Sequence, residues 1–187
     1  FKETFYHKGG GVGQTPDYWN NNYQDDIYFR NGKPEESKGY CTDVFFDEAI
    51  SFINKNKENP FLCFLSLNAP HSPFNVPKEY YELYENESDL LESQKRFYGM
   101  ITNIDDNFGR LHQNVKSLGI LDNTIIIFTT DNGTSNGYKY SKKDKKWLGF
   151  NAGMRGTKTS EYDGGHRVPF IIKWKKGGLF GGHNYSG

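Results

Sequence analysis

Two short apolar runs, separated by the pattern of a long helix, constrain the fold of this chain most. Phe61–Leu67 and Thr124–Thr130 are bounded by polar residues or proline and are typical of strands buried on both faces. Between about Glu92 and Leu118, apolar residues recur every three or four positions, and Gly119 follows where the helix should end. We therefore predict an α/β fold with a largely parallel sheet flanked by helices, in which the two runs are neighbouring or near-neighbouring parallel strands. The inward-facing residues of the long helix are expected to be Phe97, Ile101, Ile104, Phe108, Leu111, Val115 and Leu118.

Three further segments complete the predicted order of elements. Thr42 is a suitable N-cap for a helix with Asp43 in its first turn, and Val168–Trp174 is a third predicted strand. Residues 1–40 form a loop-rich opening segment with a turn at Gly32-Lys33-Pro34 and at most short strands around Ile27–Arg30. The apolar face of the first helix is expected to contain Phe45, Ala49, Phe52 and Ile53.

Composition excludes some partners and leaves others open. The 23 Lys and Arg residues balance 23 Asp and Glu residues, so there is no overall charge that favours nucleic acid or an acidic membrane. No apolar run approaches the roughly 18 residues of a membrane span. The oligomeric state stays open. One local group of lysines is either a solvated loop or a site for a polyanion, and it consists of Lys139, Lys142, Lys143, Lys145 and Lys146.

The two cysteines do not identify a redox compartment. Cys63 lies inside an apolar run, where a free cysteine is commonly a small buried residue, and Cys41 precedes the first helix. A disulfide between them stays open, and their spacing matches no metal site.

The first candidate site residues follow the two predicted parallel strands. Ligands of open α/β sheets gather beyond the carboxyl ends of the strands, where His71 follows the first run and Asp131-Asn132 follows the second. A carboxylate and an amide carbonyl are hard oxygen donors that suit calcium or magnesium, although Asp-Asn-Gly is also a common turn. His71, held between Pro70 and Pro73, is either a surface residue or an acid that protonates a leaving group.

A glycine-rich segment from Met154 to Pro169 carries the other candidates. Lys158 can present a positive charge to an anionic oxygen, and so can Arg155 or Arg167, although one of these arginines could simply pair with Asp163. Two acidic pairs have weaker support. Asp105-Asp106 is expected on the flank or solvent face of the long helix, and Asp25-Asp26 has no supporting neighbours.

In order and spacing, these pieces resemble the sulfatase family, which is arylsulfatase-like and belongs to the alkaline-phosphatase superfamily. The resemblance covers most of the chain, which we interpret as a partial catalytic domain over residues 1–187. It rests on residues 39–43, 69–74, 104–111, 129–133, 156–158 and 163–169.

The resemblance implies a role for each candidate. Asp131 and Asn132 resemble two of the four side-chain ligands of a single calcium ion. Lys158 resembles the lysine that binds a sulfate oxygen. His71 resembles the histidine that contacts the sulfate and assists departure of the alcohol. The family usually has Glu where this chain has Asp163, a position that looks structural.

Two motifs of the family are absent from these 187 residues. The motif whose Cys or Ser becomes formylglycine is missing, since Cys41 is followed by Thr-Asp-Val. The aspartate pair that completes the calcium site is missing too. The chain is therefore predicted to be an inactive internal fragment, with formylglycine expected in a preceding segment.

The parent protein is then expected to hydrolyse sulfate esters. Sulfated carbohydrates are a slightly better prediction than aryl sulfates, since the aromatic-rich opening segment could stack on sugar rings. A periplasmic or secreted location is expected. One alternative is a phosphatase, phosphodiesterase or phosphonate hydrolase of the same superfamily, although these commonly use extra histidines to bind two zinc ions. The other is a sulfatase-like binding module without turnover.

Overall fold

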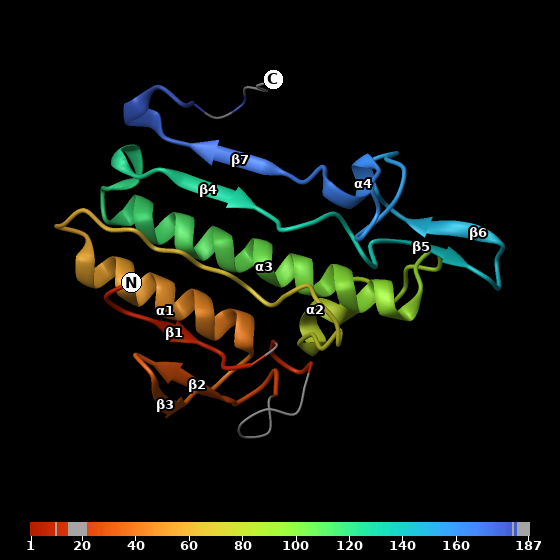
Figure 1. The fold of residues 1–187 in the computed structure, drawn as a ribbon, viewed down its shortest axis with the longest axis horizontal. Coiled ribbons are helices and arrows are strands. Elements are labelled where there is room, and N and C mark those ends of the chain that lie inside the picture. The colour runs from red at the N-terminus through yellow and green to blue at the C-terminus, as the bar shows by residue number, and fades with distance from the viewer. Residues whose placement is uncertain (10, 15–21, 181, 183–187) are drawn as a thin grey trace. The chain divides into compact units, whose positions relative to one another are not determined.

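The computed structural model describes residues 1–9, 11–14, 22–180 and 182 (Figure 1). The chain divides into two compact units. The first unit contains residues 1–87 and 95–114, and the second contains residues 88–94 and 115–187. The long helix α3 (Glu92–Ser117) supplies residues to both. The chain therefore contributes two separate stretches to each unit.

A small antiparallel sheet opens the first unit. Its strands β1 (Phe5–Tyr6), β2 (Ile27–Arg30) and β3 (Lys33–Glu36) are paired in the order β1-β2-β3. The connection between β2 and β3 is Asn31-Gly32, and both residues have positive φ values, as a two-residue hairpin turn requires. The short strand expected at Ile27–Arg30 is confirmed. The turn expected at Gly32-Lys33-Pro34 lies one residue earlier, because Lys33 and Pro34 pair with β2.

The first helix, α1 (Cys41–Asn56), forms where the sequence predicts it. Its buried face includes Phe45, Ala49 and Ile53, as expected from their spacing. The expected N-cap was wrong. Tyr40 holds that position without a side-chain capping bond, and Thr42 is a buried residue inside the first turn.

The long helix α3 buries a face that is partly polar. Its apolar residues Phe97, Ile104 and Val115 are buried as predicted, and Gly119 adopts the left-handed conformation just beyond the helix end. Ile101, expected to face inward, is 40% exposed. Buried amides take part of the inward face instead, because they have a carboxylate partner on α1. These amides belong to Asn103 and Asn107.

The second unit contains two separate antiparallel strand pairs. Strand β4 (Ile126–Thr129) pairs with β7 (Phe170–Lys173), and β5 (Tyr138–Ser141) pairs with β6 (Lys146–Gly149). The strands predicted at Thr124–Thr130 and Val168–Trp174 are confirmed over their central residues. The remaining elements are α2 (Lys78–Glu82) in the first unit, and η1 (Leu121–Asn123), α4 (Asp163–His166) and η2 (Lys175–Gly177) in the second.

The strand predicted at Phe61–Leu67 is not formed, and the parallel arrangement of this run with Thr124–Thr130 stays a prediction, because the two segments belong to different units. Residues 61–67 are assigned to no strand, and the only strand paired with β4 among the described residues is β7, which runs antiparallel to it. Burial nevertheless alternates along 61–67, where Leu62 and Phe64 are exposed and Phe61, Cys63 and Leu65 are half-buried. That alternation is the pattern of a strand with one covered face. The segment therefore has the side-chain pattern of a strand, but it pairs with none of the strands that the described residues form.

None of the helices formed by residues 1–9, 11–14, 22–180 and 182 is long and apolar enough to cross a membrane.

Candidate functional site

The loop that carries Asp131 and Asn132 follows directly after Thr129, the last residue of β4. The Asn132 side-chain amide donates to the Gly133 carbonyl over 2.9 Å, and the Thr130 hydroxyl donates to the Asn132 carbonyl over 3.3 Å. Asp131 is exposed and Asn132 half-buried. These bonds fix the turn without using the Asp131 carboxylate or the Asn132 side-chain oxygen, so both oxygens stay available for a ligand.

Glycines let this loop pack directly against the backbone of the glycine-rich segment. The Gly133 amide donates to the Gly165 carbonyl over 2.9 Å. A Cβ atom on Gly133 would lie 1.9 Å from the Gly164 carbonyl oxygen, and one on Gly164 would lie 2.0 Å from that of Gly156. No other residue fits such approaches without moving the backbone. The paired glycines of α4 are therefore required by the close packing of three chain segments.

Lys158 lies beside the Asp131-Asn132 loop because the two segments are hydrogen-bonded. Its backbone amide donates to the Thr134 carbonyl over 2.8 Å. Its side chain is half-buried, and the described residues provide no hydrogen bond or ion pair to its ammonium group. The second unit thus brings a carboxylate, an amide oxygen and an uncommitted cation onto two adjoining loops.

The two arginines of the glycine-rich segment have structural partners. Arg167 lies 3.4 Å from the Asp163 carboxylate, so the pairing left open for one arginine belongs to Arg167. The Arg155 guanidinium lies 3.5 Å from the centre of the Tyr162 ring. The sequence did not point to Asn151, a buried residue whose side-chain amide donates to the Gly156 carbonyl over 2.6 Å. Asn151 therefore helps hold the loop that presents Lys158.

His71 lies in an exposed loop of the first unit, and its ring is oriented by its own neighbour. Its Nδ1 is 2.9 Å from the Ser72 carbonyl, which can only accept, so Nδ1 carries a proton and Nε2 takes no part in this bond. The Tyr23 hydroxyl donates to the His71 carbonyl over 3.1 Å and accepts from the Asn68 amide over 2.7 Å. Burial raises the pKa of Tyr23, which keeps its hydroxyl protonated as a donor.

The four predicted site residues are divided between the units. His71 belongs to the first unit, whereas Asp131, Asn132 and Lys158 belong to the second. The structure brings the last three onto adjoining loops. The convergence of His71 with them stays a prediction.

The family model for sulfatases, described simply as Sulfatase, matches residues 2–179. The chain belongs to the sulfatase family. The chain is 31% identical over 157 residues to the uncharacterized sulfatase YdeN of Escherichia coli K12, covering 82% of this chain and 26% of that protein. It is 32% identical over 135 residues to an N-acetylgalactosamine-6-O-sulfatase of Bacteroides thetaiotaomicron, covering 71% and 25%. The chain therefore spans about a quarter of the length of these relatives.

Solved structures of sulfatases share the α/β fold of this chain. The crystal structure of Ps i-CgsB matches with a TM-score of 0.75 and 29% identity over 94% of this chain and 40% of that one. The same protein was also crystallised in complex with k-i-k-neocarrahexaose, with a TM-score of 0.73. The structure of yidJ from Bacteroides fragilis matches with a TM-score of 0.65 and 25% identity over 87% of this chain and 37% of that one. The predicted α/β, sulfatase-type fold class is thereby confirmed.

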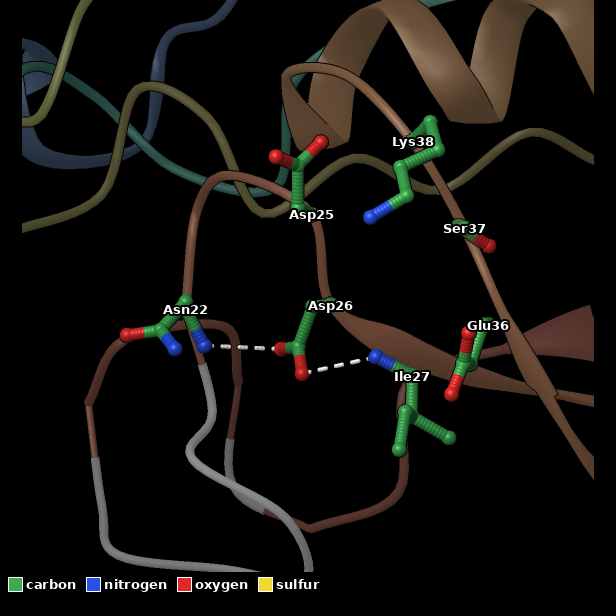
Figure 2. Close-up of a pocket in the computed structure, with 7 residues that line it drawn as sticks. All are labelled: Asn22, Asp25, Asp26, Ile27, Glu36, Ser37 and Lys38. Carbon is green, nitrogen blue, oxygen red and sulfur yellow. Dashed lines mark hydrogen bonds between the residues drawn. The ribbon is translucent and has the colours of Figure 1, made fainter.

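The acidic pair Asp25-Asp26 of this sulfatase chain braces a loop (Figure 2). Asp26 is buried, and its carboxylate accepts the backbone amides of Asn22 and Ile27 over 2.8 and 2.7 Å. Asp25 accepts the backbone amide of Gly39 over 2.8 Å. These bonds use both carboxylate oxygens of Asp26 and one of Asp25 to fix the backbone of the loop. The pair on the long helix, Asp105 and Asp106, is exposed as expected.

The cysteines of this sulfatase chain are both free. Burial raises the pKa of the Cys41 thiol to about 12 and also raises that of Cys63. Neither thiol is therefore a thiolate near neutral pH, and neither has the surroundings of a reactive nucleophile.

The oxygen donors of the β4 loop fit calcium as part of a larger site. No cluster of three or more His, Cys, Asp or Glu side chains suited to a metal occurs in the described part of the chain. Asp131 and Asn132 nevertheless supply two hard oxygens, whereas calcium takes six to eight. The two residues therefore suit a calcium site that needs further ligands from elsewhere.

Proposed function

We propose that the protein containing this chain hydrolyses sulfate esters, and that its substrates are sulfated carbohydrates. The observation that carries this proposal is the pairing of two loops in the second unit. Hydrogen bonds between residues 133–134 and the 158–165 segment hold Lys158 beside the loop of Asp131 and Asn132. A sulfate ester suits this arrangement, because its oxygens can contact both the Lys158 ammonium and a cation held by Asp131 and Asn132.

Each residue has a distinct part in the proposed reaction. The Lys158 ammonium binds a sulfate oxygen and stabilises the charge that develops there in the transition state. Asp131 and Asn132 hold the calcium ion. When bound, calcium supplies positive charge to the sulfate oxygens, and formylglycine, expected outside these 187 residues, supplies the nucleophile.

His71 is proposed to protonate the leaving alcohol. Its Nδ1 proton is held by the Ser72 carbonyl, so the imidazolium form presents the second proton on Nε2. Sugar alkoxides are poor leaving groups and gain most from that proton. Turnover of carbohydrate sulfates should therefore depend on His71 more strongly than turnover of activated aryl sulfates.

The relatives support carbohydrate substrates. They include proteins named as N-acetylgalactosamine-6-O-sulfatase and as ulvan-active sulfatase. Four of the described aromatic residues of the opening segment are buried in the first unit and cannot stack on sugar rings, namely Tyr23, Tyr28, Phe29 and Tyr40. Phe1 and Tyr6 are exposed, and Tyr18 and Trp19 lie outside the described residues. A periplasmic or secreted location stays a prediction, which cell fractionation would test.

The test uses the full-length protein. We expect it to release sulfate from N-acetylgalactosamine 6-sulfate or from carrageenan oligosaccharides, to lose this activity with a calcium chelator and to regain it with calcium. The variant His71→Ala should lower turnover of these substrates about a hundredfold, yet lower turnover of 4-nitrophenyl sulfate much less, because nitrophenolate leaves without protonation. Phosphate release with a zinc requirement would favour the phosphatase alternative. Binding of sulfated sugars without any turnover would favour the binding module.

A further inference from the structure

The β5–β6 hairpin of the second unit separates its side chains into two unlike faces. The register pairs Tyr140 with Trp147 and Tyr138 with Gly149, so these residues share one face. The other face carries alternate residues. They are Lys139, Ser141, Lys146 and Leu148.

The aromatic face is organised and open to solvent. Trp147 stacks on Tyr138 with ring centres 4.8 Å apart and 15° between the ring planes, and Tyr140 lies edge-on to Trp147 at 5.8 Å. The diagonal stack is possible because Gly149, opposite Tyr138, has no side chain. Trp147 is 53% exposed and Tyr140 45% exposed. Flat rings fixed in this way form a platform without first having to be ordered.

The opposite face is the one that packs on the rest of the unit. Leu148 and Ser141 are buried, and the buried Gln94 side chain donates to the Leu148 carbonyl over 2.9 Å. Lys146 lies 3.2 Å from the Asp89 carboxylate. The hairpin is thus held against residues 88–94 by one face, and the aromatic face does not belong to the core of this unit.

The turn of the hairpin adds positive charge beside the aromatic face. Lys142, Lys143 and Lys145 are exposed, and the described residues offer no ion pair to any of them. The single acidic residue of the turn, Asp144, accepts a hydrogen bond from the Ser141 hydroxyl over 2.6 Å. With three lysines and one aspartate, residues 142–145 carry a net charge of +2 (3 − 1), and their one carboxylate is bonded to a hydroxyl rather than to a lysine.

We propose that the β5–β6 hairpin binds a sulfated polysaccharide, with Trp147 and Tyr140 stacking on sugar rings and the turn lysines contacting sulfate groups. Amphipathic sugar rings suit exposed aromatic faces, and dispersed sulfates suit lysines, which act as point charges on flexible stems. The choice of glycan over other polyanions rests on the proposed function. The hairpin contains none of the residues assigned to hydrolysis. It is therefore proposed as a second binding site, which keeps a polymeric substrate bound to the protein.

The test measures binding of the full-length protein to ι-carrageenan and to the same polymer after chemical desulfation, by affinity electrophoresis. We expect the sulfated form to bind at least about tenfold more tightly, because only it engages the lysines. Trp147→Ala should weaken binding about tenfold, whereas Trp147→Phe should retain most of it. Replacing Lys142, Lys143 and Lys145 together by serine should weaken binding and reduce its dependence on salt. The matched control replaces three exposed lysines of the first unit by serine, namely Lys2, Lys33 and Lys55.

The outcomes separate this site from the catalytic proposal. Unchanged binding by both Trp147→Ala and the triple turn variant would overturn the assignment, as would equal affinity for the desulfated polymer. Equally tight, Trp147-dependent binding of an oligothymidylate of about 20 nucleotides would assign the hairpin to nucleic acid instead. Loss of polysaccharide binding with unchanged turnover of 4-nitrophenyl sulfate supports the inference. Trp147-dependent binding in a protein that releases no sulfate would refute the proposed hydrolysis and leave this site standing.

Discussion

Lys158 is held in place by its backbone and leaves its charge uncommitted. Lys158 is half-buried, its backbone amide is bonded to the Thr134 carbonyl, and its ammonium group has no partner among the described residues. We predict that Lys158→Ala lowers kcat/KM for sulfate esters about a hundredfold or more in the full-length protein, because a cation near the developing charge is lost. Steady-state kinetics would measure this. Lys176→Ala removes an exposed lysine as the control, and an equal loss in both variants would contradict the role of Lys158.

The buried thiols give a second prediction for single residues. Burial raises the pKa of Cys41 to about 12, above the value of about 8.5 for a free thiol. Folding therefore keeps the proton on Cys41, and this contribution to stability, complete below about pH 8.5, is lost as pH rises toward 12. We expect a thiol reagent at pH 8 to label Cys41 only after denaturation. Rapid labelling of native Cys41 at that pH would show that the thiol is accessible and ionised.

The chemistry of single residues was enough to predict the candidate site residues, but not the residues that position them. Asp131, Asn132 and Lys158 could be chosen because oxygen donors and a lysine follow predicted strands or lie among glycines. The role of Asn151 could not be predicted, since a single asparagine in a polar loop belongs to no repeating pattern. The need for glycine at 164 could not be predicted either, because it arises from a carbonyl of residue 156 that only the folded chain brings close.

At the scale of elements, helices α1 and α3 are joined by buried polar groups. The Asp43 carboxylate on α1 accepts from the side-chain amides of Asn103 and Asn107 over 2.8 and 2.7 Å. Both asparagines are almost fully buried. Removing their shared acceptor would leave one N–H group of each side-chain amide without its acceptor, although the Asn107 amide would keep its bond to the Asn103 carbonyl over 2.9 Å.

We predict that Asp43→Ala lowers the free energy of unfolding by about 2–4 kcal/mol, because each unsatisfied donor costs about 1–3 kcal/mol. Denaturant titration of the full-length protein would measure the loss. Asp47→Ala, one turn further along α1, is a matched control, since its pair with Arg110 is exposed and should contribute no more than about 1 kcal/mol. Equal effects of the two substitutions would argue against the buried network.

The elements differed in how far the sequence could predict them. The helices were predicted well because their apolar spacing is a property of one segment, although Ile101 was misplaced by the polar contacts of Asn103 and Asn107. Strands depend on a partner. The central residues of β4 and β7 were found, but Phe61–Leu67 shows that an apolar run does not reveal whether a neighbour exists to pair with it. The β5–β6 hairpin was missed because its lysines obscure the alternation of Tyr138, Tyr140 and Trp147.

At the scale of the whole molecule, each unit exposes apolar side chains that a folded core would cover. In the first unit, Leu62 is 73% exposed and Phe64 75% exposed. In the second, the β4–β7 pair exposes Ile127 and Phe170. Monomeric soluble proteins rarely expose large contiguous apolar patches, and such patches commonly mark surfaces that contact other molecules.

We therefore predict that the isolated 187-residue chain self-associates, since contact between copies removes these side chains from water. Sedimentation velocity should show an average mass that rises with concentration, and a dye that binds apolar surfaces should fluoresce with the chain. Replacing Leu62 and Phe64 by serine should lower both signals. Leu83→Ser is the control, because Leu83 is also exposed but lies alone at the end of α2. A chain that stays monomeric over the whole concentration range and binds no dye would show that these side chains are covered in solution. Residues 61–67 would then need no neighbouring strand, despite their alternating burial.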